Sequence, residues 1–300
     1  MDLKYIEHAK DLVETKDESN PYDFDNIFKF DSFGERRLSK RKLKVLKVID
    51  PTVRKMLKDG ENVYYMTDGV RTSSLENLFI GWIAYYYNYM AFVFTSERVI
   101  LIHLKSKRKK GAYVGEIKYT DIKSIHSSFL GNFTLKFNNN KNVLFRKVPR
   151  KDRKFLKDFL NPILGQAESI ADTAIPGIRN LCPRCFTHIT HYPSLCPNCS
   201  CKLKSPVIAG CLSLILPGLG DIYLGSKILG FMELTFVILI WAGLIVSVIE
   251  EYQMGSNIYE SLIPILVFMF IFHGTDALKS RYLARKGIFP NEKINYEAGS

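Results

Sequence analysis

Two Cys-x-x-Cys motifs separated by ten residues constrain the fold of this 300-residue chain more than any other part of its sequence. Each motif turns tightly enough to aim two thiolates at one point, and a short loop can bring the second pair round to complete a tetrahedral shell. Two disulfides would instead need an oxidising compartment, whereas charged residues interrupt residues 1–10 from the start, unlike a secretory signal. The sequence therefore predicts a zinc ribbon in the reducing cytosol, with zinc held by Cys182, Cys185, Cys196 and Cys199.

Three further side chains near these motifs could also bind metal. Cys201 follows the second motif, and His188 and His191 lie between the two motifs. Because the paired spacing already supplies four ligands, we expect these three residues to be bystanders. Cys211 lies in an apolar stretch, and we expect it to be a small buried hydrophobic residue.

The net charge of +12 is concentrated in three basic clusters. Residues 1–35 are acidic, with ten Asp and Glu residues against four Lys residues. Seven bases and no acid lie in residues 36–47, five bases lie in residues 105–110, and seven bases with one acid lie in residues 146–157. Such clusters are typical of contact with anionic lipid headgroups or with nucleic acid, or they are simply solvated faces. No helix-turn-helix, aromatic RNA-binding motif or Cys₂His₂ spacing supports nucleic acid.

The pattern of apolar residues divides the part before the cysteine motifs into helical and strand-rich sections. Residues 1–60 predict an N-terminal helical region, with helices at 2–15 and 36–49 and another that begins at Pro51. Short strands of alternating polarity follow, and then an amphipathic helix at 150–164. Several antiparallel strands with one closing helix predict a small β-barrel or β-sandwich that is capped at one end.

Two motifs in the strand-rich section carry a family resemblance. Residues 94–100 read Phe-Thr-Ser-Glu-Arg-Val-Ile, and residues 119–125 read Tyr-Thr-Asp-Ile-Lys-Ser-Ile. With these motifs, residues 61–164 resemble the bacterial pleckstrin-homology-like (PH-like) domains, which implies a PH-like barrel with Arg98 and Asp121 as framework positions. Eukaryotic relatives of such domains bind phosphoinositides through a basic loop between strands. The candidates for lipid or partner contact in this chain are therefore Lys105, Lys107, Arg108, Lys109 and Lys110.

The remaining chain reads as a linker, the ribbon and three apolar segments. Residues 165–180 show no clear period and predict a linker, and we place the zinc ribbon at 181–204. A membrane span needs about 20 apolar residues, so the segment at 228–249 qualifies and the segment at 262–278 is just long enough. The first segment, at 205–220, is short and contains two prolines, which predicts a re-entrant or interfacial segment.

Charges beside the apolar segments predict their orientation. Basic residues flank the first segment and follow the third, whereas the loop at 250–260 carries three Glu residues and no base. Positively charged flanks stay in the cytosol, so we predict that residues 1–204 and the tail at 289–300 are cytosolic. Two full crossings of the cytoplasmic (inner) membrane satisfy this arrangement, and three crossings are the alternative.

A second resemblance lies in the apolar part. Residues 217–225, Pro-Gly-Leu-Gly-Asp-Ile-Tyr-Leu-Gly, are similar to the hairpin of the TM2 family and its bacterial relatives, and the resemblance covers about residues 205–288. Glycines let two backbones approach closely, and proline breaks a helix. Ionisable groups at membrane depth, here including Glu233 and His273, are functional candidates, interfacial caps or hydrogen-bond partners within a helical bundle. The hairpin residues that we single out are Pro217, Gly218, Gly220, Asp221, Tyr223, Gly225 and Asp276.

The sequence carries no recognisable catalytic arrangement. It has no P-loop, no Gly-x-Ser-x-Gly elbow and no His-Glu-x-x-His helix. We expect a multidomain α+β membrane protein that is not an enzyme and that presents a zinc ribbon and a PH-like domain at the cytosolic face of a bacterial inner membrane. Its partner would be a protein or anionic lipid. Two alternatives are a regulator or channel-like component that uses the membrane hairpin, and a membrane-tethered nucleic-acid binder.

Overall fold

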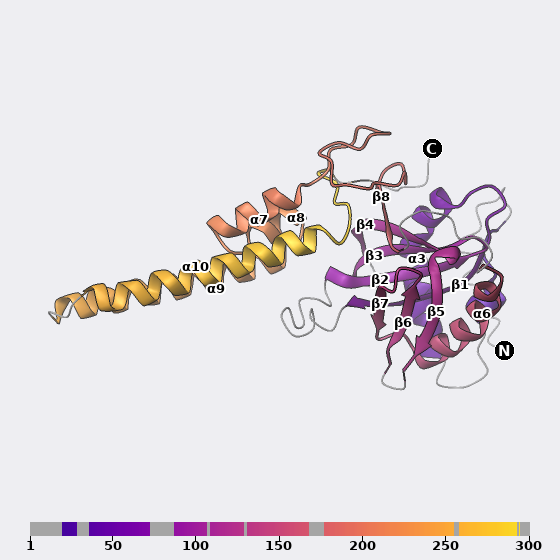
Figure 1. Cartoon of the computed structure of the whole chain (residues 1–300), viewed down its shortest axis with the longest axis horizontal. Helices are drawn as coiled ribbons and strands as arrows, with labels where there is room; N and C mark the ends of the chain where they lie inside the picture. Colours follow the sequence, from indigo (N-terminus) through magenta and orange to yellow (C-terminus); the bar gives the residue numbers. More distant parts are fainter. Residues whose placement is uncertain are drawn as a thin grey trace. The chain divides into compact units, whose positions relative to one another are not determined.

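The structure of the chain is a computed structural model that forms two compact units (Figure 1). The first unit comprises residues 1–190 with 294–300, and the second comprises residues 191–293. The helix expected at 2–15 lies outside the described residues. The structure describes residues 20–28, 36–72, 87–106, 109–128, 131–167, 177–254, 258–292 and 294.

The first unit is built on one eight-stranded antiparallel sheet (Figure 1). The strand order is β5-β6-β7-β1-β2-β3-β4-β8, so most neighbours in the sheet are also neighbours in sequence. The expected mixed α+β fold is confirmed. The strands are β1 (Val63–Thr72), β2 (Tyr89–Thr95), β3 (Arg98–Ser106), β4 (Lys109–Lys118), β5 (Ile122–Ser127), β6 (Phe133–Phe137), β7 (Asn142–Arg146) and β8 (Arg179–Leu181).

Alternate side chains of the central strands point to opposite faces of the sheet, and both faces are buried. On one face, Phe92 and Phe94 of β2 line a small apolar cavity together with Phe145 of β7. The rings of Phe92 and Phe145 meet edge to face, with their centroids 4.6 Å apart. Leu156 of α6 (Arg150–Ala167) lines the same cavity, so this helix closes one core, as the sequence predicts.

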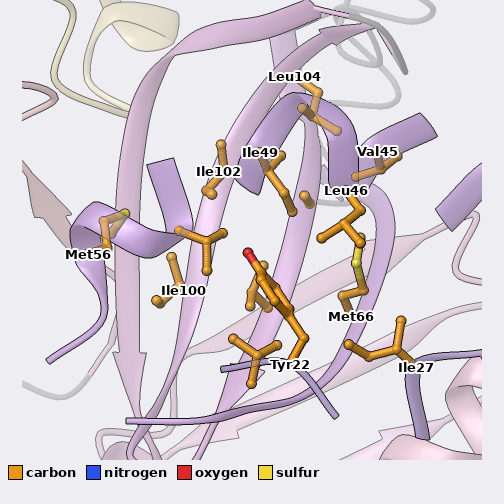
Figure 2. Packing of buried hydrophobic residues seen from close by; sticks show 14 of the residues in the cluster. Tyr22, Ile27, Val45, Leu46, Ile49, Met56, Met66, Ile100, Ile102 and Leu104 are labelled. Atoms are coloured by element: carbon orange, nitrogen blue, oxygen red, sulfur yellow. The ribbon is translucent and has the colours of Figure 1, made fainter. Parts of the chain in front are cut away.

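The opposite face of the sheet is covered by α3 (Arg36–Met56) (Figure 2). Leu46 and Ile49 of this helix belong to the same buried cluster as Ile100 and Ile102 of β3. Full burial of a side chain of this size contributes about 1.5–3 kcal/mol. The helix α3 and the sheet therefore share one hydrophobic core.

The prediction that a new helix begins at Pro51 is wrong, because α3 continues through this residue. Proline removes one N–H and so leaves the carbonyl four residues earlier without its helical partner. That residue is Lys47, which is exposed. Ile49 and Val53, on either side of Pro51, are fully buried against the sheet, and this packing outweighs the cost of the proline.

A buried lysine connects α3 to the sheet and to α6. Lys42 is 1% exposed, its Nζ donates to the Ile27 carbonyl at 2.9 Å, and it lies 3.3 Å from Asp152 Oδ1 of α6. The hydroxyl of Tyr65, on β1, donates to the same carboxylate oxygen at 2.8 Å. Burial lowers the pKa of Lys42, while Asp152 acts in the opposite direction. This network joins four elements at one point: α2 (Phe24–Ile27), α3, β1 and α6.

Arg98 and Asp121, the two expected framework positions, both make ion pairs within the first unit. The Nε and Nη2 atoms of Arg98 each lie 3.0 Å from a carboxylate oxygen of Glu61. Arg98 Nη2 also donates to the carbonyl of Met56, the last residue of α3, at 2.6 Å. Asp121 Oδ2 lies 3.3 Å from Arg179 Nη2 of β8. Both contacts agree with a framework role.

The predicted linker at 165–180 is partly structured. The helix α6 ends at Ala167, and β8 begins at Arg179 and pairs with β4, with Leu181 opposite Val114. Residues 168–176, between them, lie outside the described residues. Backbone pairing therefore attaches the start of the cysteine-containing segment to the sheet.

From residue 206 on, the described part of the second unit is mostly helical, and two of its helices are long and apolar. α9 and α10 are long and apolar enough to cross a membrane, whereas α7 is shorter. Lys279, near the end of α10, lies 2.5 Å from Glu233, near the start of α9, so the two long helices are antiparallel. The first apolar segment forms a short helix, a break at Pro217 and a second short helix, as its prolines predict. The four helices are α7 (Pro206–Ile215), α8 (Leu219–Leu224), α9 (Lys227–Gln253) and α10 (Ile258–Ala284).

Replacing the buried Lys42 with Met should destabilise the first unit by about 3 kcal/mol, because removal of the cation leaves the Asp152 carboxylate buried without it. Lys44→Met is the matched control, since Lys44 is exposed on the same helix and surface substitutions usually change stability by less than ~0.5 kcal/mol. Pulse proteolysis of the full chain in urea measures both variants. Equal stability of the two variants would show that the Lys42–Asp152 pair does not hold α3 in place.

Candidate functional site

Four cysteine thiols converge on one point. The sulfur atoms of Cys182, Cys185, Cys196 and Cys199 lie 3.6–3.7 Å from one another. A tetrahedral Zn²⁺ ion with Zn–S bonds of about 2.3 Å requires sulfur atoms about 3.8 Å apart, whereas a disulfide brings two sulfur atoms to about 2.05 Å. All four cysteines are free thiols. The donor set and its spacing therefore fit a tetrahedral metal ion such as zinc.

Both Cys-x-x-Cys turns have the same backbone conformation. In the first, the Phe186 N–H donates to the Cys182 carbonyl at 2.9 Å, and Phe186 has a φ of 59°. In the second, the Ser200 N–H donates to the Cys196 carbonyl at 3.0 Å, and Ser200 has a φ of 54°. A left-handed residue thus reverses the chain directly after each motif. The repeated turn explains how two short motifs supply one closed shell of four ligands.

The structure separates the four thiols from the other candidate ligands. His188, His191 and Cys201 do not belong to the thiol cluster in the described part of the chain. The Cys201 carbonyl accepts the Cys196 N–H at 3.0 Å, and the residue at the same place after the first motif makes the equivalent contact. The backbone of Cys201 therefore completes the turn. The expectation that Cys211 is buried is wrong, because this residue lies exposed on the apolar surface of α7.

The five bases predicted for lipid contact lie around the turn between β3 and β4, and this turn is only partly described. Lys107 and Arg108 lie outside the described residues. Lys109 is exposed, whereas Lys105 and Lys110 are half-buried. Burial and the nearby Lys55, at the end of α3, lower the pKa of Lys110 to about 6. At neutral pH this pKa favours the uncharged form of the Lys110 side chain. The described part of the turn therefore carries less positive charge than its sequence suggests.

The predicted membrane hairpin packs through glycines. Gly218 and Gly225 bound α8, with φ angles of 90° and 95° that favour glycine. A Cβ atom on Gly218 would lie 2.4 Å from the carbonyl oxygen of Gly230, and a Cβ atom on Gly230 would lie 2.6 Å from that of Gly218. The Tyr223 hydroxyl accepts the backbone N–H of the residue that caps α7, at 3.0 Å. The hairpin thus contacts α9 where no side chain fits.

Three carboxylates of the second unit surround one lysine. Lys279 Nζ lies 3.1 Å from Asp221, 2.5 Å from Glu233 and 2.6 Å from Asp276. Asp276 also accepts the Gly218 N–H at 3.1 Å, which ties the hairpin to α10. The carboxylates lie within 4.8 Å of one another, a spacing that could hold a metal ion, and Lys279 supplies a cation there. Lys279 is not among the residues that the sequence motifs predict, although its i,i+3 spacing from Asp276 is a signal for this pairing.

Comparison with known proteins supports the strand-rich section. The family model of the bacterial PH domain matches residues 57–161, which contain β1 to β7 and most of α6. The PH-like resemblance is thereby confirmed for this part of the chain. No curated protein and no solved structure matches the chain. The similarity of residues 217–225 to the TM2 hairpin stays a prediction.

The purified full chain should contain about one equivalent of zinc, and Cys196→Ser should lose it, because three thiolates leave the tetrahedral shell incomplete. Metal binding contributes to the folding free energy of such sites, so this variant should also be cleaved faster by protease within residues 182–199. Cys201→Ser is the matched control and should keep both the metal and the protease resistance. Elemental analysis measures the zinc. A full equivalent retained by Cys196→Ser would remove this residue from the ligand set.

Gly230→Ala should destabilise the second unit by about 1–3 kcal/mol, because the added methyl group would overlap the Gly218 carbonyl. Gly243→Ala, in the same helix, is the matched control: no atom lies within 4 Å of its Cβ position. Alanine is a better helix former than glycine by about 1 kcal/mol, so the control should be neutral or stabilising. Thermal unfolding in detergent compares the two. If Gly230→Ala is as stable as Gly243→Ala, α8 and α9 do not touch at this point.

Proposed function

We propose that this chain is a non-enzymatic bacterial membrane protein that holds a zinc ribbon and a PH-like domain at the cytosolic face of the inner membrane. There the two parts bind a protein partner or anionic lipid. The exposed apolar surface of α9 and α10 is the observation that carries the proposal. The PH-like section and the four thiols precede these helices in the same chain.

The two long helices expose apolar side chains together. Phe236 and Leu239 of α9 are 59% and 66% exposed, and Phe270 of α10 is 77% exposed. Contiguous apolar patches on a protein mark contact with lipid or with another protein. Each helix has 27 residues and is therefore about 40 Å long, whereas the hydrocarbon core of a bilayer is about 30 Å thick. The length and the composition of both helices support membrane spans.

The distribution of charge supports a cytosolic location for the start of α9 and the end of α10. These two ends lie together because the helices are antiparallel, and they carry Lys227, Arg281 and Arg285. Glu250 and Glu251 lie at the other end of α9. Basic flanks stay in the cytosol. The same compartment would keep the four zinc-site thiols reduced.

A binding role is supported by the chemistry of the thiol site. Catalytic zinc keeps one coordination position open for water or substrate, whereas structural zinc is closed by four protein ligands. Here four thiols already supply a complete shell. Zinc at this site would hold the two turns together. A partner would then bind to the surfaces of the ribbon and the PH-like domain.

The carboxylates around Lys279 favour a second candidate function, that of a regulator or channel-like component. Three acids and one base lie together in an apolar helical unit, and such groups often line ion or proton pathways. In this case Asp221→Asn should change ion flux in liposomes that contain the purified chain. Under the leading proposal, the same variant should leave flux at the level of protein-free liposomes.

Cysteine accessibility should show Met254→Cys labelled from outside intact cells, and Asn291→Cys labelled only after permeabilisation. Met254 is 74% exposed at the end of α9, and Asn291 is exposed beyond α10. The expectation follows from the acidic end of α9 and the basic end of α10. The background would carry Cys201→Ser and Cys211→Ser, and the same background without a reporter supplies the blank.

Two results of this labelling would contradict the proposal. Outside labelling of Asn291→Cys with protection of Met254→Cys would invert the orientation. Outside labelling of both positions would mean that the helices do not make two crossings with both flanks in the cytosol.

A further inference from the structure

We infer that the outward side of α3 binds the surface of an anionic lipid bilayer. The inference rests on the proposed attachment to a membrane. It assigns a binding surface outside the turn between β3 and β4, and outside residues 57–161, which match the bacterial PH domain. This surface, the basic face of α3, consists of Arg37, Lys40, Lys44, Lys47 and Lys55.

The five bases form one stripe along the helix, and all five are exposed. At about 100° per residue they fall within a sector of about 80° around the helix axis. At a rise of about 1.5 Å per residue, Arg37 and Lys55 are about 27 Å apart along the axis. The buried side chains Leu46, Ile49 and Val53 occupy the other side of α3, against the sheet. Most of the stripe therefore points away from the sheet, whereas Lys55, at its end, lies near Lys110 of β4.

The bases of α3 differ in their partners according to the side that they occupy. Towards the sheet, Lys42 lies 3.3 Å from Asp152, and Arg41 lies 2.6 Å from Asp68. The one acid of the helix, Asp50, accepts from Arg54 at 3.0 Å. On the basic face, ion pairs with other described residues are absent for Arg37, Lys40, Lys44 and Lys47. The charge of these four side chains is therefore available to an external anion.

A bilayer fits this stripe better than single-stranded nucleic acid does. Proteins that bind single-stranded nucleic acid combine bases with aromatic side chains on which nucleotides stack. α3 contains no aromatic residue. A straight row of flexible cations instead suits a flat surface of headgroups, where charge alone decides binding. The proposed spans α9 and α10 belong to the same chain and would keep headgroups at high local concentration.

Acetylation of individual lysines on the full chain in lipid nanodiscs tests the inference. In neutral phosphatidylcholine discs, Lys44, Lys47 and Lys55 should react as exposed lysines. In discs that also contain phosphatidylglycerol, their rates should fall about fivefold or more, since each base near an anionic surface gains about fivefold in binding. Salt at about 1 M should restore the rates, because it screens charges beyond roughly 3 Å. Lys123, exposed on β5, should react equally in both discs.

A charge-removal variant isolates the basic face. The quadruple variant with Arg37, Lys40, Lys44 and Lys47 changed to Gln leaves Lys55 as a reporter on the same stripe. At about fivefold per base, four lost bases weaken attachment several hundredfold, so Lys55 should react equally in both discs. The matched control loses the same number of charges from strands of the sheet and one turn between them, and it should keep Lys55 protected. Its substitutions to Gln are at Lys118, Lys123, Lys136 and Lys141.

The outcomes separate this inference from the proposed function. Failure of the wild-type chain to co-elute with either disc would overturn the membrane attachment and the inference with it. Co-elution with both discs, with the same reaction rates of Lys44, Lys47 and Lys55 in both, would overturn the inference alone. If duplex DNA lowers the acetylation rates of these lysines in neutral discs and anionic lipid does not, the inference would also be overturned. The stripe would then be assigned to nucleic acid.

Discussion

The apolar surface of α9 and α10 is the constraint on which the rest of the chain depends. Side chains such as Leu239 and Phe270 are mostly exposed, and at about 25 cal/mol per Å² their contact with water is costly. A bilayer removes that cost without any further protein contact. The parts on either side of the helices must then remain in water, and the charges beside the helices agree with this division.

Inside such an environment, each polar group needs a partner within the protein. The short helices α7 and α8 supply many of these partners. Ser213 of α7 lies 2.8 Å from the hydroxyl of Ser280, and the Leu214 carbonyl lies 2.9 Å from Nδ1 of His273. Lys279 has its carboxylates from α8, α9 and its own helix. The first apolar segment, which is broken at Pro217 into α7 and α8, therefore covers the polar side of the long helices near one end.

Sequence alone identifies the features whose signal is local. The thiol set follows from two tight turns, and the alternation of Phe133–Phe137 marks a strand with one buried face. Features that depend on distant contacts do not follow. α3 passes Pro51 because its neighbours pack on the sheet, β8 joins a strand that lies far away in sequence, and Lys279 meets acids from three helices. The exposure of Cys211 likewise cannot be predicted without knowing which side of α7 lies against α10.

Extraction of native membranes with alkaline carbonate tests most directly whether α9 and α10 lie in lipid. Carbonate strips proteins that are held by charge or by other proteins, whereas spans stay in the bilayer because transfer of their apolar surface to water is costly. We expect the full chain to remain in the membrane pellet and to be released only by detergent. Complete release into the carbonate supernatant would contradict the membrane assignment and would mean that another protein covers the apolar surface.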